Sequence, residues 1–501
     1  MLRQLSCSRL AENIGTALGH LKPSGLPRYE VEIQRRGIAT VECREKTCKL
    51  LVIGGGSGGC SIAAKFAPKL GKDNVVVVEP SDVHYYQPMF TLIGGGMKSL
   101  EDARKPMADV LPKDVDWVQD SVQKIEPQGN YVTTLSGKRI NYEYMIVAAG
   151  LKVDYTRIPG LVDSLNMPGS GVCSNYSPDY VEKTYKALMS FEEGNLVFTF
   201  PNTPVKCAGA PQKICYIAEH YLRKTGKRGK ARVLYQTAQP KLFGVKRYAD
   251  SLWKICRTRG IEVNLLSNLV EIEPDRKIAY FESLDNPEMP RTAVPYSVLH
   301  VTPPMVPPPF LRCSPMVCDS AGFLDIDPNT LKHKFFSNIY GIGDCTNLPT
   351  SKTAAAVAAQ SGIVYENMLL TMSDQEPTSI YNGYTSCPLI TGYNKCIMAE
   401  FDYSLQPLET FPMDQSKEST LLFYVKKELM PLLYWHVMLK CVTKKYKERV
   451  KRSVGKQCGT GVGEESKSAW EERMTEETGE EVKTTKGIDE FHEVKVGQKE
   501  R

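Results

Sequence analysis

The sequence has no Cys-x-x-Cys pair and no cluster of cysteines and histidines at metal-ligand spacing, although it contains 15 cysteines among 501 residues. Zinc sites and many redox motifs draw their ligands from such short spacings. We therefore expect no metal ion. Most of the cysteines are expected to be reduced or buried thiols of an intracellular protein.

Long apolar runs and a strong charge imbalance are also missing. No apolar stretch approaches the roughly 18 residues of a membrane-spanning helix, so the chain is not expected to cross a membrane. The formal net charge of +6 is small for this length, and no zinc-finger or aromatic-basic RNA motif is present. These absences argue against a nucleic-acid partner, and the length allows about three domains.

A glycine-rich motif near the amino end is the most informative feature that is present. An apolar strand predicted at 49–53 runs into Gly54-x-Gly56-x-x-Gly59, a small-residue helix follows, and a second apolar strand ends at Glu79. In a dinucleotide-binding unit the glycines permit a tight turn and close backbone approach, the helix amino terminus faces a pyrophosphate, and the acid accepts from ribose hydroxyls. The residues expected to bind the cofactor here are Gly54, Gly56, Ser57, Gly58, Gly59 and Glu79.

A second signature, Gly341-x-Gly343-Asp344, indicates that the dinucleotide is FAD rather than NAD. In flavoenzymes with two dinucleotide-binding domains, this turn places its aspartate beside the ribityl and phosphate part of the flavin. The small-residue helix that follows Lys352 could press its amino terminus against the isoalloxazine ring, with Lys352 stabilising negative charge on the reduced ring.

Another strand–helix–strand unit is predicted between the two signatures, with strands at 195–201 and 231–235 and a helix at 212–222. A nicotinamide site would need a glycine-rich turn after the first strand. Here the turn carries two prolines, Lys206 and Cys207, and no acid closes the second strand. We infer that the nicotinamide site is abandoned and that the turn presents Cys207. Nearby Lys206 and Lys213 and the helix start favour its thiolate, the alternative being a cysteine that only packs.

The fold class predicted is α/β, with two Rossmann-like dinucleotide-binding domains, the FAD domain being interrupted by the second, and a C-terminal membrane-interface region. Leucines at helical spacing with arginines in the first forty residues resemble a mitochondrial presequence, the alternative being a disordered extension. The predicted segments are a targeting or disordered segment 1–48, an amino-terminal portion of the FAD-binding domain 49–160, a second domain with Cys207 161–294, a carboxy-terminal portion of the FAD-binding domain 295–375, a C-terminal region with Cys387 376–443, and a charged tail 444–501.

Three long motifs, at 198–213, 341–357 and 384–394, closely resemble the mitochondrial sulfide:quinone oxidoreductase family, and the resemblance covers about 49–439. It implies that Cys207 and Cys387 are the redox-active pair, which spacing alone does not show because 180 residues separate them. It adds Gln87 and Val122 to the FAD site, Val122 in a strand beside the adenine. It further implies oxidation of hydrogen sulfide, with electrons passed through FAD to ubiquinone and sulfane sulfur passed to glutathione or sulfite.

The C-terminal region is predicted to contact the mitochondrial inner membrane as a peripheral, monotopic protein. The segment 429–439 is apolar and aromatic and has lysines on both sides, which suits an interfacial helix; a core helix or a partner-binding patch is the alternative. The candidate quinone-facing residues are Tyr384, Tyr393 and Phe401. From its own surroundings, Cys387 is expected in a loop before a strand. The tail after 440 is basic and then rich in Glu, Lys and Thr, which predicts disorder.

Two other functions stay open on the sequence alone. One is a flavin dehydrogenase of the same architecture that takes electrons from NADH, and the other is a non-catalytic sulfur-binding homologue. Cys60, Cys173, Cys215 and Cys345 are expected to be structural, with a third sulfur-handling thiol among them as the alternative.

Overall fold

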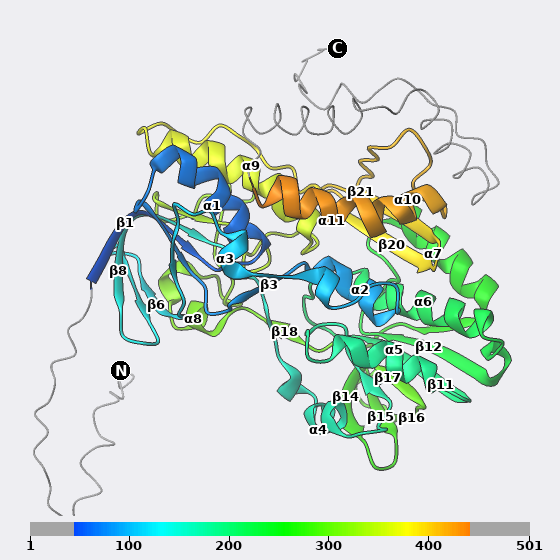
Figure 1. Ribbon diagram of the computed structural model, residues 1–501. Coiled ribbons are helices and arrows are strands. Elements are labelled where there is room, and N and C mark those ends of the chain that lie inside the picture. The colour runs from blue at the N-terminus through cyan, green and yellow to red at the C-terminus, as the bar shows by residue number, and fades with distance from the viewer. Residues whose placement is uncertain (1–44, 441–501) are drawn as a thin grey trace, which may run out of the picture. The chain divides into compact units, whose positions relative to one another are not determined.

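The computed structural model describes residues 45–440 (Figure 1). Strand β1 begins at Glu45, ahead of the predicted domain start at 49. The rest of the predicted targeting segment and the whole predicted charged tail lie outside the described residues.

The first sheet is the core of the predicted FAD domain. Its strand order is β5 (Asp116–Val118), β2 (Val75–Val78), β1 (Glu45–Ile53), β8 (Arg139–Val147), β7 (Tyr131–Thr134) and β6 (Val122–Glu126), with β19 (Ile339–Gly341) also paired to β8. Strands β5, β2, β1, β8 and β19 are parallel. The central strands are runs of Val, Leu and Ile buried on both faces, as expected for a parallel sheet covered by helices. Helices α1 (Ser57–Leu70) and α9 (Ala354–Thr371) lie side by side on one face (Figure 1).

The second sheet is fully parallel, with order β10 (Val172–Cys173), β17 (Val298–His300), β11 (Gly194–Phe200), β12 (Ala231–Thr237) and β13 (Ile261–Asn264). Helices α5 (Val181–Met189), α6 (Ala210–Lys224) and α7 (Lys246–Arg259) accompany it. A three-stranded antiparallel sheet, β14 (Ser267–Glu273), β15 (Ile278–Ser283) and β16 (Thr292–Pro295), extends this region of the chain. Two Rossmann-like parallel sheets therefore confirm the predicted α/β class.

The chain leaves the first sheet through β9 (Lys152–Val153) and returns through β18 (Met305–Val306), and these two short strands pair with each other. The predicted boundaries at 161 and 294 lie between them in the sequence.

The small elements before the C-terminal region are β3 (Val83–Tyr85), β4 (Arg104–Pro106), α2 (Phe90–Gly94), α3 (Met107–Val110), α4 (Leu161–Asn166), α8 (Pro309–Arg312) and short 3₁₀ turns at Gln87–Met89, Glu101–Ala103, Tyr155–Arg157, Arg228–Lys230 and Pro315–Val317.

A C-terminal hairpin, β20 (Thr385–Gly392) and β21 (Lys395–Phe401), packs against α6 and α9. Cys387 lies inside β20, opposite Ala399, so the expectation that it occupies a loop before a strand is wrong. The adjacent Pro388 suggested a loop, but β20 pairs with β21 alone. Proline is tolerated there because β20 has one edge without a partner strand.

A helical segment follows the hairpin and consists of α10 (Thr420–Tyr424), a π-helical turn η7 (Val425–Leu429), α11 (Met430–Leu433) and a second π-helical turn η8 (Tyr434–Met438). No helix among residues 45–440 is long and apolar enough to cross a membrane.

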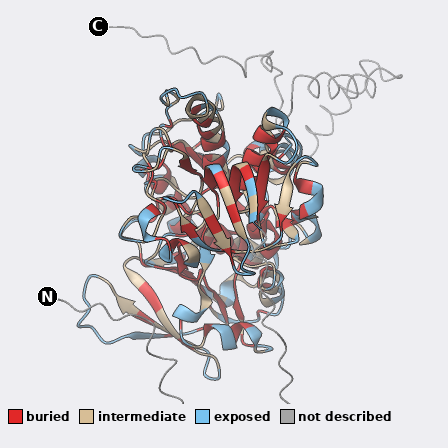
Figure 2. Cartoon of the chain, turned by 90° about the vertical axis from the view of Figure 1, so that its left-hand side faces the viewer, coloured by how far each residue is buried: buried red, intermediate tan, exposed pale blue. Residues whose placement is uncertain are grey.

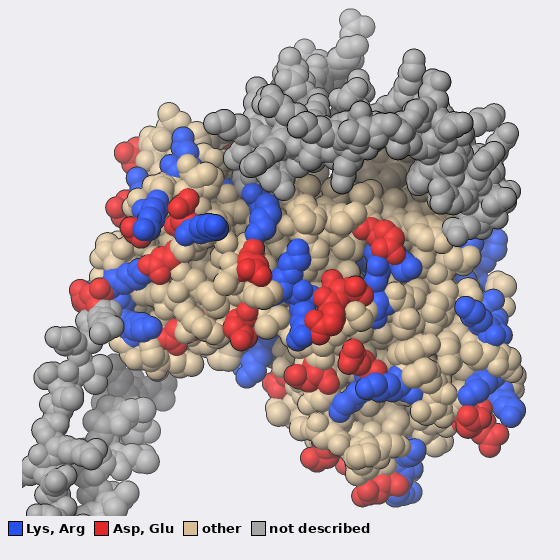
Figure 3. All heavy atoms as spheres, in the orientation of Figure 1, with Lys and Arg blue, Asp and Glu red and all other residues tan. Residues whose placement is uncertain are grey.

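Buried residues fill the strands and the inner helix faces (Figure 2). On the face seen in Figure 3, acidic and basic side chains are interspersed.

Candidate active site: the glycine loop and the cysteine pair

The three motif glycines of the loop after β1 have three different physical roles. Gly54 has φ +101° and a Cβ there would lie 2.7 Å from the Ala148 carbonyl oxygen, so the turn requires glycine. A Cβ on Gly59 would lie 1.7 Å from the Gly54 oxygen, so helix α1 packs against the strand only without a side chain. A Cβ on Gly56 would meet nothing within 4 Å. Bare backbone facing open space at the start of α1 is the cradle that a pyrophosphate needs.

Glu79 follows β2 and closes the same loop. Its Oε2 accepts a hydrogen bond from the Gly55 N–H at 2.6 Å, and its Oε1 accepts from the Ser81 N–H at 2.8 Å. Each carboxylate oxygen keeps a further lone pair for a ribose hydroxyl. Glu79 is therefore held rigidly at the position where the sequence predicted it.

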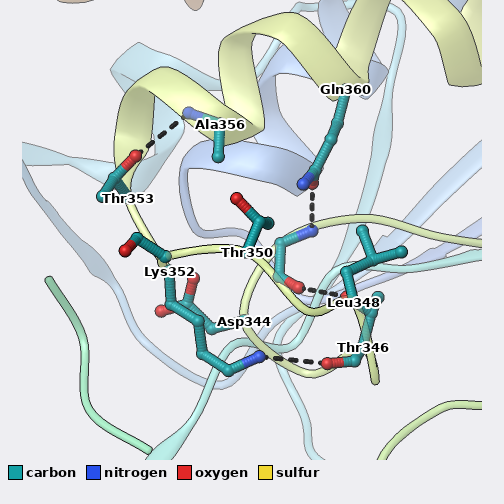
Figure 4. A pocket seen from close by; sticks show the side chains of 10 residues that line it. Asp344, Thr346, Leu348, Thr350, Lys352, Thr353, Ala356 and Gln360 are labelled. Atoms are coloured by element: carbon teal, nitrogen blue, oxygen red, sulfur yellow. Dashed lines mark hydrogen bonds between the residues drawn. The ribbon is translucent and has the colours of Figure 1, made fainter. Parts of the chain in front are cut away.

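The second predicted signature forms a small pocket at the start of α9. Asp344 and Lys352 line it together with Thr350, Thr353 and Gln360 (Figure 4). The Lys352 ammonium donates to the Thr346 carbonyl at 3.0 Å, and the Gln360 side-chain oxygen accepts from the Gly343 N–H at 2.8 Å. Burial raises the pKa of Asp344, opposed by the charge of Lys352, and burial lowers the pKa of Lys352. The predicted aspartate and lysine thus line one pocket, where the charge of each acts on the pKa of the other.

The last two predicted cofactor residues lie apart from each other. Gln87 begins a 3₁₀ turn, and its side-chain oxygen accepts from the Lys206 ammonium at 3.3 Å, which places it beside the cysteine loop. Val122 is buried at the start of β6 in the first sheet. Their contact with FAD stays a prediction.

Cys207 and Cys387 meet despite their separation in sequence. Their sulfur atoms lie 3.5 Å apart, and the Lys213 ammonium on α6 lies 3.2 Å from the Cys207 sulfur. The Cys207 N–H donates to the Lys352 carbonyl at 2.8 Å, which fixes the cysteine loop to the flavin signature. A Cβ on Gly209 would lie 2.5 Å from the Cys387 sulfur, so glycine there makes room for the pair. Cys207 itself has φ +56°, a conformation that non-glycine residues adopt at a cost.

The surroundings of the pair favour a thiolate on Cys207. A hydrogen bond from Cys387 and the Lys213 ammonium hold the pKa of Cys207 well below its usual range, against the effect of burial. The same hydrogen bond and burial raise the pKa of Cys387. Burial lowers the pKa of Lys213, but the charges of Cys207 and Cys387 outweigh it and raise the value. Cys207 is therefore the ionised member of the reduced pair, as the sequence predicted from its neighbours.

Lys426 is a residue of this site that the sequence does not reveal by its neighbours. The lysines that flank the apolar segment are expected at lipid headgroups, yet Lys426 is 3% exposed and its charge acts on Cys207, Cys387 and Cys396. Burial and the charge of Lys213 lower the pKa of Lys426 to about 8. A lysine between apolar residues at helical spacing was the available signal.

The other cysteines singled out by sequence are buried. Burial raises the pKa of Cys60, Cys173, Cys215 and Cys345, which leaves each of them a protonated, weakly nucleophilic thiol. Their burial favours the structural interpretation. Within the described region of the chain, no group of three or more histidine, cysteine or acidic residues could hold a metal ion.

The three aromatic residues expected to face a quinone do not form one wall. Tyr384 and Phe401 lie at the end of the hairpin near Lys352, and Phe401 and Lys352 line one cleft of about 430 Å³. Tyr393 lies in the turn at the other end, where its hydroxyl donates to the Gly95 carbonyl at 2.7 Å. Eight residues of extended strand span about 27 Å, so Tyr393 cannot share a site with the other two.

The apolar segment 429–439 has one buried and one exposed face. Trp435 is 7% exposed and packs beside His84 and Tyr86, so this aromatic residue of the predicted interfacial segment does not face lipid. Leu432 and Leu433 are 57% and 47% exposed. Leu421, Tyr424, Leu429 and Val437 complete an exposed apolar stripe along the helical segment.

The arrangement corresponds to a known class of proteins. Residues 48–187 match the family of pyridine nucleotide-disulphide oxidoreductases. The solved structure of the sulfide:quinone oxidoreductase from the bacterium Aquifex aeolicus superposes with a TM-score of 0.67 at 20% identity, over 81% of this chain and 95% of that chain. The fold and the glycine loop therefore define a dinucleotide-binding oxidoreductase of the type that typically binds FAD.

Curated relatives narrow the class to one family. The mitochondrial sulfide:quinone oxidoreductase of Mus musculus is 54% identical over 392 residues, which is 78% of this chain and 86% of the mouse protein. The mitochondrial sulfide:quinone oxidoreductase of Dictyostelium discoideum is 43% identical over 78% of this chain and 86% of its own length. The chain belongs to the mitochondrial sulfide:quinone oxidoreductase family, as its motifs predicted.

Replacing Lys213 with methionine is expected to raise the pKa of Cys207. The Cys387 hydrogen bond remains, but the buried ammonium is lost. Because the wild-type pKa is low, reactivity with iodoacetamide persists to a lower pH than for an ordinary cysteine; in Lys213→Met it will be lost at a higher pH. Peptide mass spectrometry of the reduced, labelled protein measures this profile for Cys207. Lys224→Met, an exposed lysine on the same helix, is the control, and a profile unchanged by Lys213→Met would contradict the assignment.

Proposed function

We propose that this chain oxidises hydrogen sulfide at the Cys207–Cys387 pair, passes two electrons through FAD to ubiquinone, and passes sulfane sulfur to glutathione or sulfite. The observation that carries the proposal is the 3.5 Å separation of the two sulfur atoms beside Lys213. Two S–S bonds of about 2.05 Å each, at the bond angle of divalent sulfur, span about 3.3 Å. The pair therefore accommodates a bridge with one additional sulfur atom, and a small closure gives a direct disulfide.

The residues around the cysteine loop fit FAD. Gly56 leaves open space at the start of α1, Glu79 is fixed for ribose, and Asp344 and Lys352 share a pocket that touches the cysteine loop. FAD held by these residues would accept two electrons from the sulfur pair and deliver them to a quinone.

The sulfur chemistry follows from the pair itself. Hydrosulfide attacks Cys387 of the oxidised pair, a new S–S bond forms, and the bond to the Cys207 side breaks. Cys387 is left as a persulfide, and the sulfur released on the Cys207 side is an anion that the Lys213 ammonium stabilises. The acceptor, as a thiolate or sulfite, then takes the outer sulfur and frees the Cys387 thiolate. The S–S bond between the two cysteines then forms again, and the two electrons lost by the sulfur atoms would be accepted by FAD, which balances the cycle.

The experiment that tests this function is an anaerobic comparison of two reductants on the FAD-loaded protein. Sulfide is expected to bleach the flavin absorbance within the mixing time of a conventional assay, whereas NADH leaves it unchanged because the turn after β11 carries Pro201, Pro204 and Lys206 in place of glycines. Bleaching by NADH alone would show the flavin dehydrogenase function instead. Bleaching by neither would favour a non-catalytic sulfur-binding protein.

We further propose a peripheral site of action on the mitochondrial inner membrane, where the quinone is dissolved. The exposed stripe of the helical segment supplies the membrane contact, because an amphipathic helix buries its apolar face at the headgroup boundary. Tyr384 and Phe401, at the Lys352 end of the hairpin, are the proposed quinone contacts. The names of the relatives support the compartment.

Serine at both Leu432 and Leu433 is expected to weaken binding to liposomes at least about tenfold, because each leucine loses its apolar transfer energy. Reoxidation of the enzyme by a long-tailed quinone should slow in parallel, while reduction by sulfide stays unchanged. Liposome co-sedimentation measures the binding. Leu135→Ser, an exposed leucine outside the segment, is the control. Equal loss with a short-chain, water-soluble quinone would show that the two leucines serve the fold and not the membrane.

A further inference from the structure

A chain of three hydrogen bonds joins the C-terminal helical segment to the glycine loop. The Ser57 hydroxyl lies 2.8 Å from the Tyr434 hydroxyl, which lies 2.6 Å from His84 Nε2. On the other side of the imidazole ring, His84 Nδ1 lies 2.9 Å from the Gly55 carbonyl oxygen. His84 is 2% exposed and Tyr434 is 4% exposed, so water does not compete for these bonds.

The chemistry of the groups assigns a direction to each bond. The Gly55 carbonyl only accepts, so His84 Nδ1 carries a proton and donates it. Burial lowers the pKa of His84 to about 4, so the ring is neutral at neutral pH and Nε2 is an acceptor. Tyr434 must then donate to His84, and its oxygen accepts from the Ser57 hydroxyl. The result is one ordered chain from Ser57 through Tyr434 and His84 to Gly55.

Ring packing holds Tyr434 in this position. Its ring centroid lies 4.4 Å from that of Tyr86, and the neighbouring Trp435 ring lies 5.6 Å from His84 with the Lys105 ammonium 4.7 Å above it. The same segment continues to Lys440, which donates to the Asp109 carbonyl at 2.5 Å. The aromatic face of the segment therefore packs against His84, Tyr86 and Lys105, and the Tyr434 hydroxyl reaches the glycine loop at Ser57.

The two ends of this hydrogen-bond chain, Ser57 and Gly55, belong to the segment that forms the cradle. Ser57 is the first residue of α1, whose amino terminus faces the space where a pyrophosphate binds, and Gly55 is in the turn beside Gly56. Glycine-rich backbone loses much conformational entropy when it is ordered. Hydrogen bonds from outside the loop therefore lower the free-energy cost of holding it in the binding geometry. Neither Tyr434 nor His84 belongs to the fingerprint that predicts the loop.

We propose that Tyr434 and His84 are positioning residues that couple FAD occupancy of the glycine loop to the seating of the helical segment 420–440. The proposal rests on the FAD binding stated above. The seated segment orders the loop for FAD, and by linkage bound FAD stabilises the seated segment to the same extent. Bound FAD therefore favours the seated form of the segment that presents the exposed apolar stripe.

The first test is the affinity of apo-protein for FAD, measured by quenching of flavin fluorescence in wild type and Tyr434→Phe. Phenylalanine keeps the ring packing on Tyr86 and removes only the hydroxyl, which leaves His84 Nε2 and the Ser57 hydroxyl without their partner. The Kd for FAD is expected to rise about tenfold. Tyr280→Phe removes a tyrosine hydroxyl that donates to Glu273 in the three-stranded sheet, and it is expected to bind FAD as wild type does. A thermal melt of each apo-protein verifies folding.

A double-mutant cycle isolates the coupling. Ser57→Ala alone is expected to weaken FAD binding to a similar extent, and the Ser57→Ala, Tyr434→Phe double variant to lose little more than either single variant. Additive losses would show that the two residues act independently and would overturn the proposal.

The second readout is limited proteolysis of the segment 420–440 with and without FAD. FAD is expected to slow cleavage there in wild type, and to slow it about tenfold less in Tyr434→Phe. Identical FAD affinity and identical protection in the two proteins would overturn the coupling while leaving the proposed function intact. Failure of the wild-type protein to bind FAD at all would overturn the proposed function, and the coupling with it.

Discussion

Cys207→Ser and Cys387→Ser are each expected to lower the rate of flavin reduction by sulfide at least about 100-fold while FAD stays bound. The cycle needs both sulfur atoms, since one receives hydrosulfide and the other leaves. A serine hydroxyl forms no persulfide and is a far weaker leaving group. Rapid-mixing absorbance at the flavin band, under anaerobic conditions, measures the rate.

Cys313→Ser is the matched control, because Cys313 is an exposed free cysteine outside the site. It is expected to reduce its flavin at the wild-type rate. Near-normal reduction in Cys207→Ser or in Cys387→Ser would move the chemistry to another cysteine and contradict the assignment of the pair.

Gly56→Val is expected to abolish FAD binding, raising the Kd at least about 100-fold, with little change in the stability of the apo-protein. The backbone of Gly56 has φ −72°, which valine tolerates, and its Cβ position faces open space in the structure. The branched side chain would occupy the cradle where the pyrophosphate must approach the backbone. Flavin absorbance of the purified protein and a fluorescence titration with FAD measure the loss.

Gly229→Val tests whether valine at an unhindered glycine is harmless in this fold, since a Cβ there also meets nothing within 4 Å. It is expected to bind FAD as wild type does. Wild-type affinity in Gly56→Val would mean that the pyrophosphate does not contact this loop.

The dinucleotide loop could be predicted because its chemistry is local. Gly54, Gly56 and Gly59 lie within six residues; nearby backbone leaves no room for a side chain at Gly54 and Gly59, and Gly56 leaves the space beside the loop open. The thiolate on Cys207 was predictable for the same reason, since Lys213 follows it by two helical turns or less. When interacting residues are close in sequence, their contact can be predicted from local structure alone.

The contact between Cys207 and Cys387 has no local signal. It depends on packing of the β20–β21 hairpin against α6, and only the resemblance to a family pointed to it. The prediction of which face of the C-terminal segment is exposed was wrong for a different reason. Its two π-helical turns, Val425–Leu429 and Tyr434–Met438, change the number of residues per turn, so an α-helical pattern does not give the face of Trp435.

The most direct test of the central claim is peptide mapping of the oxidised protein by mass spectrometry, after free thiols are blocked at low pH. We predict one linked pair of peptides, containing Cys207 and Cys387, with the mass of a disulfide or of a bridge with one extra sulfur atom. Addition of sulfide should break this link and leave a persulfide on Cys387. Free Cys207 and Cys387 in the oxidised protein, or a link from either to another cysteine, would contradict the account.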